Sequence, residues 1–368
     1  MRTRFRLIAL ACAALACGVL AYSMVTIHAR TPVAARAADS SPGSCGRVVL
    51  PVALHAGGTA DESIAGTLCT PPDWAPGAHQ VDVLTPGGGY NSLYWDWPQD
   101  PPLYSYVGKT LQAGRAAFDY DRLGTGQSSH PLSTGVTFSA ETYVLHEIVG
   151  WLRSARGFGD VNLIGHSYGS AVTVQEAGTY RDANRVVVTS LAHIPNAGAG
   201  LVTSFLSLLH PADLDPQFAG EHLDPGYLAS IPHTRGELYS SAADPSVIAY
   251  DEAHSDVISA TALTGFGAAY ALPPGANASS HVTAPVLVLL GQDDWLFCNA
   301  PGLLDCSGSS ALRTAEARYY GSAASFTDAV IPATGHDVAL HPSADYSFSV
   351  INNWIRSTPA AAANGSGG

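Results

Sequence analysis

Ser167 lies at the centre of Gly165-His166-Ser167-Tyr168-Gly169, a stretch that could present a reactive hydroxyl. An apolar run at 161–164 precedes it and another at 171–174 follows it, so the stretch is predicted to be strand, sharp turn and helix. G-x-S-x-G in that setting is typical of a nucleophile elbow. The flanking glycines fit, because a side chain on either side of so tight a turn would clash. The pattern predicts Ser167 as a nucleophile.

A serine hydroxyl is a weak nucleophile at neutral pH, so it needs a base, and the base needs an acid that orients it. Of the 14 histidines, His336 is the predicted base, because it follows a strand-like run at 329–331 and a flexible Ala-Thr-Gly. Asp293 and Asp294 both follow the strand-like run at 286–290. The chain thus supplies the three groups in the order Ser, Asp, His.

A glycine-rich loop, Pro86-Gly87-Gly88-Gly89, follows the strand-like run at 79–84. Acyl transfer needs backbone donors aimed at a developing oxyanion, and such a loop could supply one. Tyr90, Tyr94, Trp95 and Trp97 come directly afterwards. These aromatics could line a substrate pocket, with Tyr90 and Tyr94 as the candidates, or they could be core residues.

The elements that must position these groups alternate along the chain. Strands are predicted at 47–54, 66–69, 79–84, 116–120, 185–191, 286–290 and 326–331, and helices at 104–113, 139–156, 311–319 and 343–356. Strands that alternate with helices favour an α/β fold, with a mostly parallel sheet and helices on both faces. The helix at 139–156 is the clearest, since Val144, Ile148, Trp151 and Leu152 share one face.

About 90 residues between two of these strands break the alternation. A structureless loop of that length is unusual in a compact domain, so we expect a helical cap at 193–283. The core is then expected at 38–192 and 284–357, followed by a disordered tail at 358–368. An apolar stripe in the cap (Leu201, Val202, Phe205, Leu206 and Leu209) could pack on the cap's own helices or line the active site.

Residues 1–37 are predicted to be a targeting segment. Three arginines precede an apolar run at 7–25, and Ala35-Arg36-Ala37 offers a cleavage site for a secretory signal. The run is long enough for an uncleaved membrane anchor, so both readings stay open. Either way, the body of the protein is expected outside the cytoplasm.

The charge and the cysteines agree with that compartment. Without residues 1–37, which hold five of the 17 basic residues and no acid, 12 basic residues face 30 acidic ones, a balance of −18. Such a chain is a poor partner for nucleic acid or an anionic membrane surface. Four cysteines remain beyond this segment, and we favour the pairs Cys45 with Cys69 and Cys298 with Cys306. Their spacing does not suggest a zinc site.

The motifs together resemble the α/β-hydrolase superfamily over about residues 47–356: the elbow, Asp121-Arg122-Leu123-Gly124-Thr125-Gly126-Gln127-Ser128, Gly291-Gln292-Asp293-Asp294 and Gly335-His336. The family pattern Gly-x-x-Asp implies that Asp294 is the acid. His166 is expected to be structural, and no chemistry is expected of the loop at 121–128. The position of the cap is similar to the lid insertion of the family.

The resemblance also implies an oxyanion hole made by the backbone N–H groups of Tyr168 and Gly88. Most relatives have His-Gly where this chain has Pro86-Gly87, and that departure leaves Gly89 open as the second donor. No metal or cofactor is implied.

The expected activity is that of a secreted serine hydrolase that opens a carboxylic ester or lactone of a medium-sized, partly apolar small molecule. A peptidase or amidase with the same triad is the alternative, and a non-catalytic binding module is a further one. Dehalogenase and epoxide hydrolase relatives carry Asp where this chain has Ser167.

Overall fold

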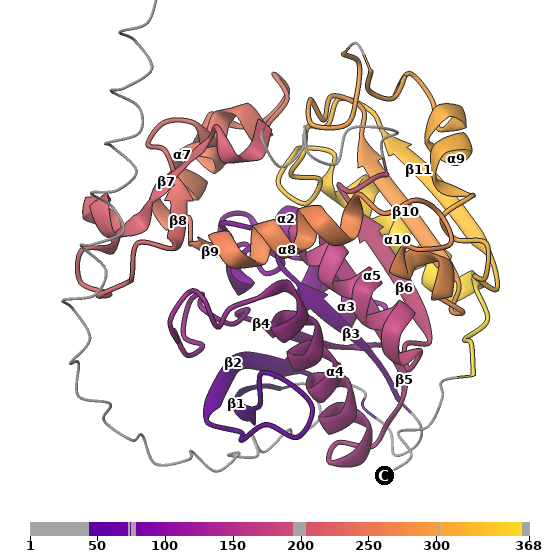
Figure 1. The fold of residues 1–368 in the computed structure, drawn as a ribbon. Helices are drawn as coiled ribbons and strands as arrows, with labels where there is room; N and C mark the ends of the chain where they lie inside the picture. The colour runs from indigo at the N-terminus through magenta and orange to yellow at the C-terminus, as the bar shows by residue number, and fades with distance from the viewer. Residues whose placement is uncertain (1–43, 73, 75–78, 194–203, 301, 363–368) are drawn as a thin grey trace, which may run out of the picture. The chain divides into compact units, whose positions relative to one another are not determined.

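A computed structural model describes residues 44–72, 74, 79–193, 204–300 and 302–362 (Figure 1). All of them belong to one compact unit, residues 33–368. The predicted targeting segment at 1–37 lies outside the described residues. Within the described ranges, no helix is long and apolar enough to cross a membrane.

One eight-stranded sheet forms the centre of this unit. Its order is β1-β2-β4-β3-β5-β6-β10-β11. The β1–β2 and β2–β4 pairs are antiparallel, and every neighbouring pair from β4 to β11 is parallel. The strands are β1 (Cys45–Val52), β2 (Glu62–Cys69), β3 (His79–Thr85), β4 (Ala116–Tyr120), β5 (Phe158–His166), β6 (Arg185–Thr189), β10 (Val286–Gly291) and β11 (Phe326–Ile331). The predicted mostly parallel sheet is confirmed.

The inner strands are largely buried because both faces of the sheet are covered. All six residues of β10, Val-Leu-Val-Leu-Leu-Gly, are buried, which is typical of a parallel strand between two layers of helices. The carboxyl ends of parallel strands lie at one edge of a sheet. The loops after β3, β5, β10 and β11, which carry all the predicted catalytic groups, therefore meet at that edge.

Helices cover the sheet (Figure 1). They are α2 (Pro101–Tyr104), α3 (Tyr106–Gln112), α4 (Phe138–Ser154), α5 (Tyr168–Tyr180), α9 (Ser310–Glu316) and α10 (Ala344–Ser357), with a short 3₁₀ helix η2 (Ser92–Tyr94). Thr137 caps α4, since its side chain accepts a hydrogen bond from the Ala140 N–H. Of the predicted apolar face, Val144, Ile148 and Leu152 are buried, whereas Trp151 is only partly buried.

The expected helical cap is only partly helical. It holds β7 (Leu209–Pro211), β8 (Tyr227–Ser230), β9 (Ile258–Ser259), α7 (Pro245–His254), α8 (Ala260–Tyr270) and the 3₁₀ helices η3 (Ala212–Leu214), η4 (Pro216–Phe218), η5 (Arg235–Leu238) and η6 (Ala278–His281). β7, β8 and β9 form an antiparallel sheet of their own. The prediction missed this sheet because strands of two to four residues are too short to show an alternating pattern.

The apolar stripe of the cap divides in the structure. Leu201 and Val202 lie outside the described residues, and Leu209 belongs to β7 rather than to a helix. Phe205 is half-buried and faces the pocket described below, whereas Leu206 is exposed. The reading of the stripe as a lining over the active site is therefore correct for Phe205 alone among the described members.

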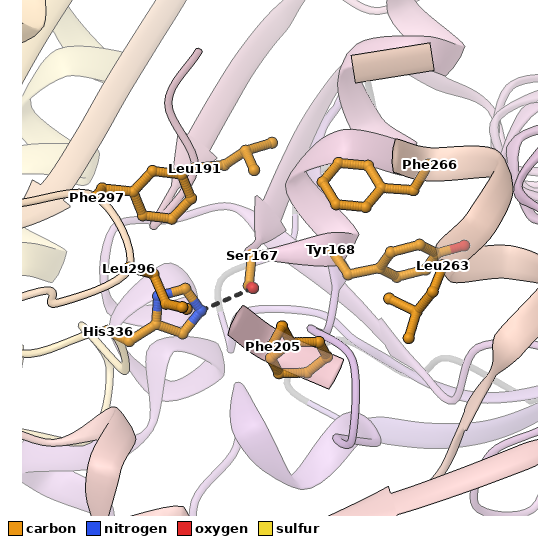
Figure 2. Close-up of a pocket in the computed structure, with 9 residues that line it drawn as sticks. All are labelled: Ser167, Tyr168, Leu191, Phe205, Leu263, Phe266, Leu296, Phe297 and His336. Atoms are coloured by element: carbon orange, nitrogen blue, oxygen red, sulfur yellow. Dashed lines mark hydrogen bonds between the residues drawn. The ribbon is translucent and has the colours of Figure 1, made fainter. Parts of the chain in front are cut away.

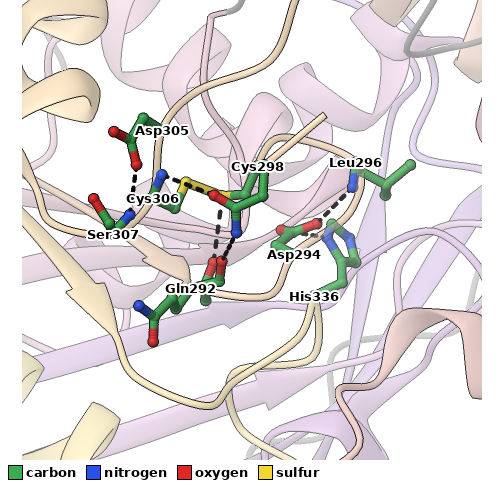
Figure 3. Close-up of a disulfide and its surroundings, with 10 residues drawn as sticks. Gln292, Asp294, Leu296, Cys298, Asp305, Cys306, Ser307 and His336 are labelled. Atoms are coloured by element: carbon green, nitrogen blue, oxygen red, sulfur yellow. Dashed lines mark hydrogen bonds and ion pairs between the residues drawn. A yellow bond between two sulfur atoms is a disulfide. The ribbon is translucent and has the colours of Figure 1, made fainter. Parts of the chain in front are cut away.

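The described residues contain two disulfides, with the pairing that we favoured. Cys45 and Cys69 are directly opposite each other in β1 and β2, with their Cα atoms 4.0 Å apart. Cys298 and Cys306 close a short loop after β10 (Figure 3). One bridge thus fastens the edge of the sheet, and the other lies beside the predicted catalytic aspartate.

Candidate active site

Ser167 lies in the strained turn that the sequence predicts. Its backbone has φ 51° and ψ −120°, a conformation that few non-glycine residues adopt. A Cβ on Gly165 would lie 2.4 Å from the Ser170 Cα, and one on Gly169 would lie 2.4 Å from the Thr85 carbonyl oxygen. Both glycines are therefore required by the close approach of β5, α5 and the end of β3.

Three side chains from three loops form one hydrogen-bonded chain. His336 Nε2 lies 2.7 Å from Ser167 Oγ (Figure 2), and His336 Nδ1 lies 2.9 Å from Asp294 Oδ2 (Figure 3). Asp294 and His336 are buried. Because His336 lies between Ser167 and Asp294, it can take the serine proton while the Asp294 carboxylate fixes the tautomer of the imidazole.

Of the two adjacent aspartates, Asp294 reaches the histidine and Asp293 is exposed. The other oxygen of Asp294, Oδ1, accepts a hydrogen bond from the Leu296 N–H at 3.1 Å. Its backbone carbonyl accepts one from the Cys298 N–H at 2.8 Å. The loop that the Cys298–Cys306 disulfide closes therefore begins at a residue bonded to Asp294 (Figure 3).

The backbone and the charge of His336 are both controlled by its surroundings. Its N–H donates to the Leu238 carbonyl in the cap at 2.8 Å, and its own carbonyl accepts from Ser190 Oγ at 2.5 Å. Burial disfavours the imidazolium, but the Asp294 carboxylate outweighs burial and raises the pKa of His336 above its usual value. A histidine in this environment is a stronger base than a free one.

Arg122 fixes the position of the glycine-rich loop through a hydrogen bond to its backbone. The Gly87 carbonyl accepts a hydrogen bond from Arg122 Nη2 at 3.0 Å, and Arg122 is paired with Glu141 at 2.8 Å. Among the described residues, no acceptor lies on the N–H of Gly88. Tyr168 is the first residue of α5, where a backbone N–H has no partner within the helix. The two N–H groups predicted as oxyanion donors are thus both available.

A largely apolar pocket opens beside Ser167 (Figure 2). It encloses about 380 Å³, including the part open to solvent, and is lined by Ser167, Tyr168, Leu191, Phe205, Leu263, Phe266, Leu296, Phe297 and His336. Phe205, Leu263 and Phe266 come from the cap, whereas the others come from the core.

Tyr90 and Tyr94, the candidate pocket residues, are not among the residues that line this pocket, and the structure favours the alternative that they are core residues. Both are buried, with exposed fractions of 4% and 0%. The Tyr94 ring stacks on the His166 ring, with centroids 4.0 Å apart. The Tyr90 hydroxyl lies 2.7 Å from Asp337 Oδ2. Their position after the loop was compatible with either role, and burial of the two rings behind the triad decided it.

A second buried His–Asp pair, which the sequence analysis missed, lies behind the triad. His166 Nε2 is 3.1 Å from Asp337 Oδ1, and both side chains are fully buried. Burial lowers the pKa of His166 to about 4, although Asp337 opposes that shift. Because His166 precedes Ser167 and Asp337 follows His336, the pair ties the two catalytic loops together. His166 is structural, as expected.

The same cluster reaches into the cap. Asp251 of α7 forms an ion pair with Arg235 of η5 at 2.7 Å and lies 3.2 Å from the Tyr90 hydroxyl. The Arg235 guanidinium lies over the Tyr90 ring, 4.1 Å from its centroid. The cap is therefore joined to Asp337, next to the predicted base, through buried polar groups.

The sheet order and the Ser–His–Asp arrangement at the carboxyl ends of its strands define an α/β hydrolase fold. A family model described as the alpha/beta hydrolase family matches residues 83–347. The chain belongs to the alpha/beta hydrolase family. No curated protein matches it by sequence.

Solved structures share this fold at low sequence identity. A lipase in an open form is 14% identical, with a TM-score of 0.58 over 85% of this chain and 98% of that one. A malate-bound thermophilic esterase from Thermogutta terrifontis is 17% identical, with a TM-score of 0.54 over 84% and 98%. A proline iminopeptidase from Mycobacterium smegmatis is 16% identical, with a TM-score of 0.50 over 80% and 95%. At these identities, the similarity concerns the fold alone.

Proposed function

We propose that this protein is a secreted serine hydrolase that opens carboxylic esters or lactones through an acyl-enzyme on Ser167. The observation that carries the proposal is the continuous hydrogen-bonded chain from Ser167 Oγ through His336 to Asp294, at the wall of an apolar pocket.

The reaction proceeds in two halves. Ser167 Oγ attacks the carbonyl carbon as its proton passes to His336 Nε2, which gives a tetrahedral oxyanion. Collapse of this intermediate breaks the bond to the leaving alkoxide, which takes the proton from His336. Water then attacks the acyl-enzyme by the same route, and the acid and free Ser167 are released. Asp294 stays ionised and stabilises the imidazolium in both halves.

The oxyanion is stabilised by the backbone N–H groups of Tyr168 and Gly88. A donor of this kind is worth about 3 to 4 kcal/mol in the transition state. Gly88 is suited to the role because the preceding carbonyl, that of Gly87, is anchored by Arg122. Gly88 also lies against the cap, since a Cβ there would be 2.7 Å from Ile258 Cδ1.

The chemistry of the pocket favours an ester over an aminoacyl amide. A substrate with a free amino terminus brings an ammonium group that needs a carboxylate partner. Among the described residues that line the pocket, none carries a carboxylate, and six are leucine or phenylalanine. An apolar acyl group fits this lining, so a peptidase acting at free amino termini is the less suited alternative.

Secretion is supported by the arginine-led apolar run at 7–25 and by two disulfides, which persist in oxidising compartments. The balance of −18 beyond residue 37 favours a small-molecule substrate over nucleic acid or an anionic membrane surface.

The test is hydrolysis of p-nitrophenyl esters and lactones of graded acyl length by the exported protein, beside a panel of aminoacyl p-nitroanilides. The wild type is expected to cleave the esters, to prefer them over the anilides, and to label with a fluorophosphonate probe. Ser167→Ala abolishes both ester cleavage and labelling, whereas the exposed Ser139→Ala changes neither. Retained ester cleavage in Ser167→Ala would refute the mechanism, and an unlabelled wild type would indicate a binding module.

A further inference from the structure

Three side chains that could bind a metal gather where α4 and α5 pack together, away from the active site. They are His146 on α4, Glu176 on α5 and Asp182 just after α5. One potential ligand atom from each lies within 4.8 Å of the other two. His146 Nδ1 is 2.8 Å from Asp182 Oδ2 and 3.6 Å from Glu176 Oε1.

The carboxylates of this cluster are buried and poorly paired. Glu176 is 0% exposed, and neither of its oxygens has a hydrogen-bond partner. Asp182 is 4% exposed, and its Oδ1 also lacks a partner. A buried carboxylate oxygen normally receives hydrogen bonds or binds a cation, because desolvation of the bare charge is unfavourable. Three carboxylate oxygens of this cluster, two from Glu176 and one from Asp182, are thus buried without a hydrogen-bond partner.

The guanidinium of Arg153 binds acceptors other than these oxygens. Arg153 directs Nη2 to the Asp182 backbone carbonyl at 2.5 Å and to Asn184 Oδ1 at 2.6 Å. His146 faces both carboxylates, and its ring is fixed by stacking on Tyr180, with centroids 3.7 Å apart. Nδ1 therefore faces two buried carboxylates.

We propose that His146, Glu176 and Asp182 bind one divalent transition-metal ion, with zinc as the ion to test. An imidazole nitrogen with two carboxylates suits zinc or manganese, whereas calcium and magnesium prefer oxygen ligands alone. Three protein ligands leave the remaining position to water. The ion displaces the proton from His146 Nδ1 and supplies the missing positive partner to the unpaired oxygens.

The site serves stability rather than catalysis. Glu176 is nine residues after Ser167, and a helix rises about 1.5 Å per residue, so the two lie roughly 13 Å apart. A bound ion links α4 to α5. Because α5 begins directly after Ser167, the ion stabilises the helix that follows the predicted nucleophile. The absence of zinc-like spacing in the sequence did not exclude this cluster, because its ligands come from different elements and meet only through helix packing.

The test measures metal content and thermal stability of the whole exported protein. After chelator treatment and dialysis, zinc is added, and bound metal is counted by mass spectrometry. We expect one zinc ion per chain. We also expect a rise in Tm of about 5 °C at a hundredfold excess of zinc over its Kd. Ester hydrolysis at 25 °C should be the same with and without zinc, so the outcome does not depend on the proposed activity.

Two variants and one control make the test specific. His146→Phe keeps a ring on Tyr180 but removes the nitrogen, and Glu176→Gln keeps the shape but removes the charge. Both should lose the bound zinc and the Tm rise. The control is His210→Phe, since His210 is paired with Asp215 at 2.9 Å with a similar exposure of 26%, but belongs to no such three-residue cluster among the described residues. Zinc bound equally by all four proteins, or by none, overturns the proposal.

Discussion

Asp337 lies 3.1 Å from His166, and each is the immediate neighbour of a predicted catalytic residue, His336 and Ser167. The contact joins the loop after β11 to the end of β5, which are 171 positions apart in sequence. Since burial lowers the pKa of His166 to about 4, the imidazole is neutral when folded. The pair thus holds the two catalytic loops together while His166 stays uncharged at neutral pH.

The first prediction concerns stability and pH. Between pH 6.5 and about 4, the unfolded chain binds a proton on His166 that the folded chain does not, so the free energy of unfolding falls as the pH falls. The lowered pKa of His166 corresponds to a loss of about 3 kcal/mol in the free energy of unfolding as the pH falls from 6.5 to 4. In His166→Asn that share of the pH dependence disappears. Denaturant titrations at pH 4.5 to 7 measure it.

The control for this prediction is His55→Asn, because His55 is exposed. It should keep the wild-type pH dependence. If the stability curves of His166→Asn and wild type stay parallel across the window, then the buried imidazole is already protonated when folded, and the assignment of a neutral His166 is wrong.

The second prediction separates the two adjacent aspartates. Asp294→Asn leaves the geometry but offers His336 the wrong hydrogen-bonding group, so kcat should fall by about 10⁴-fold. The exposed Asp293→Asn should change kcat by less than about twofold, as is usual for a surface substitution away from special features. Steady-state kinetics on one p-nitrophenyl ester suffice. Comparable losses in the two variants would contradict the assignment of Asp294.

The pH profile gives this prediction a second readout. His336 must be neutral to accept a proton, and its pKa is raised by Asp294, so kcat/KM should rise with pH through a value above the usual 6.5. Asp294→Asn removes the charge that raises the pKa of His336, whereas the burial that lowers this pKa remains. The rising limb of Asp294→Asn should therefore move to lower pH. A limb that stays in place would show that another group sets it.

The third prediction concerns Arg122, from the loop to which the sequence analysis assigned no chemistry. Arg122 anchors the Gly87 carbonyl and is paired with Glu141. Lysine at this position keeps the charge but cannot reach both partners with the same geometry. In Arg122→Lys, Gly88 is less firmly placed, so kcat should fall roughly tenfold, below the 10²- to 10³-fold loss of a whole oxyanion donor. KM should change little.

Arg185→Lys is the matched control, because Arg185 is also buried and paired, with Asp160 at 2.9 Å, but lies at the start of β6. It is expected to lower stability without lowering kcat. Equal kcat values for Arg122→Lys and wild type would mean that the loop at 121–128 has no part in the chemistry, as the sequence analysis expected.

The sequence predicted the elements with strong local signals. β4 and β11 have the predicted bounds, and the other main strands differ by a few residues. β10 was recognisable because a buried parallel strand is a continuous apolar run. The elbow was recognisable because its glycines are required by close backbone contacts. Asp294 was chosen from a family pattern, and the direction of its side chain toward His336 was not contained in the local sequence.

Other features depend on packing between distant segments. Tyr90 and Tyr94 follow a functional loop, but the sequence could not show that their rings are buried behind it against His166 and Asp337. The strands of the cap are too short to have a readable period. His146 and Glu176 belong to two helices whose facing sides are set by tertiary packing. In each case the deciding contact joins residues that no local pattern connects.

The last prediction concerns the two disulfides, which should differ in their effect on catalysis. Replacement of either pair by serine should lower the free energy of unfolding by about 3 kcal/mol, because each bridge closes a loop in the unfolded chain. Only the double variant Cys298→Ser/Cys306→Ser should also lower kcat, since the Cys298 N–H holds the Asp294 carbonyl. The variant Cys45→Ser/Cys69→Ser is the control, because that bridge lies between β1 and β2 at the edge of the sheet.

Activity is measured at 25 °C, below the Tm of both double variants, so that unfolding does not contribute. A drop in kcat with an unchanged KM for the Cys298/Cys306 variant would show that the bridge acts through the position of Asp294. Equal kcat values in the two double variants would contradict that role. The loop after β10 would then hold its shape without the bridge, through bonds such as that from Asn299 Nδ2 to the Gln292 carbonyl at 2.7 Å.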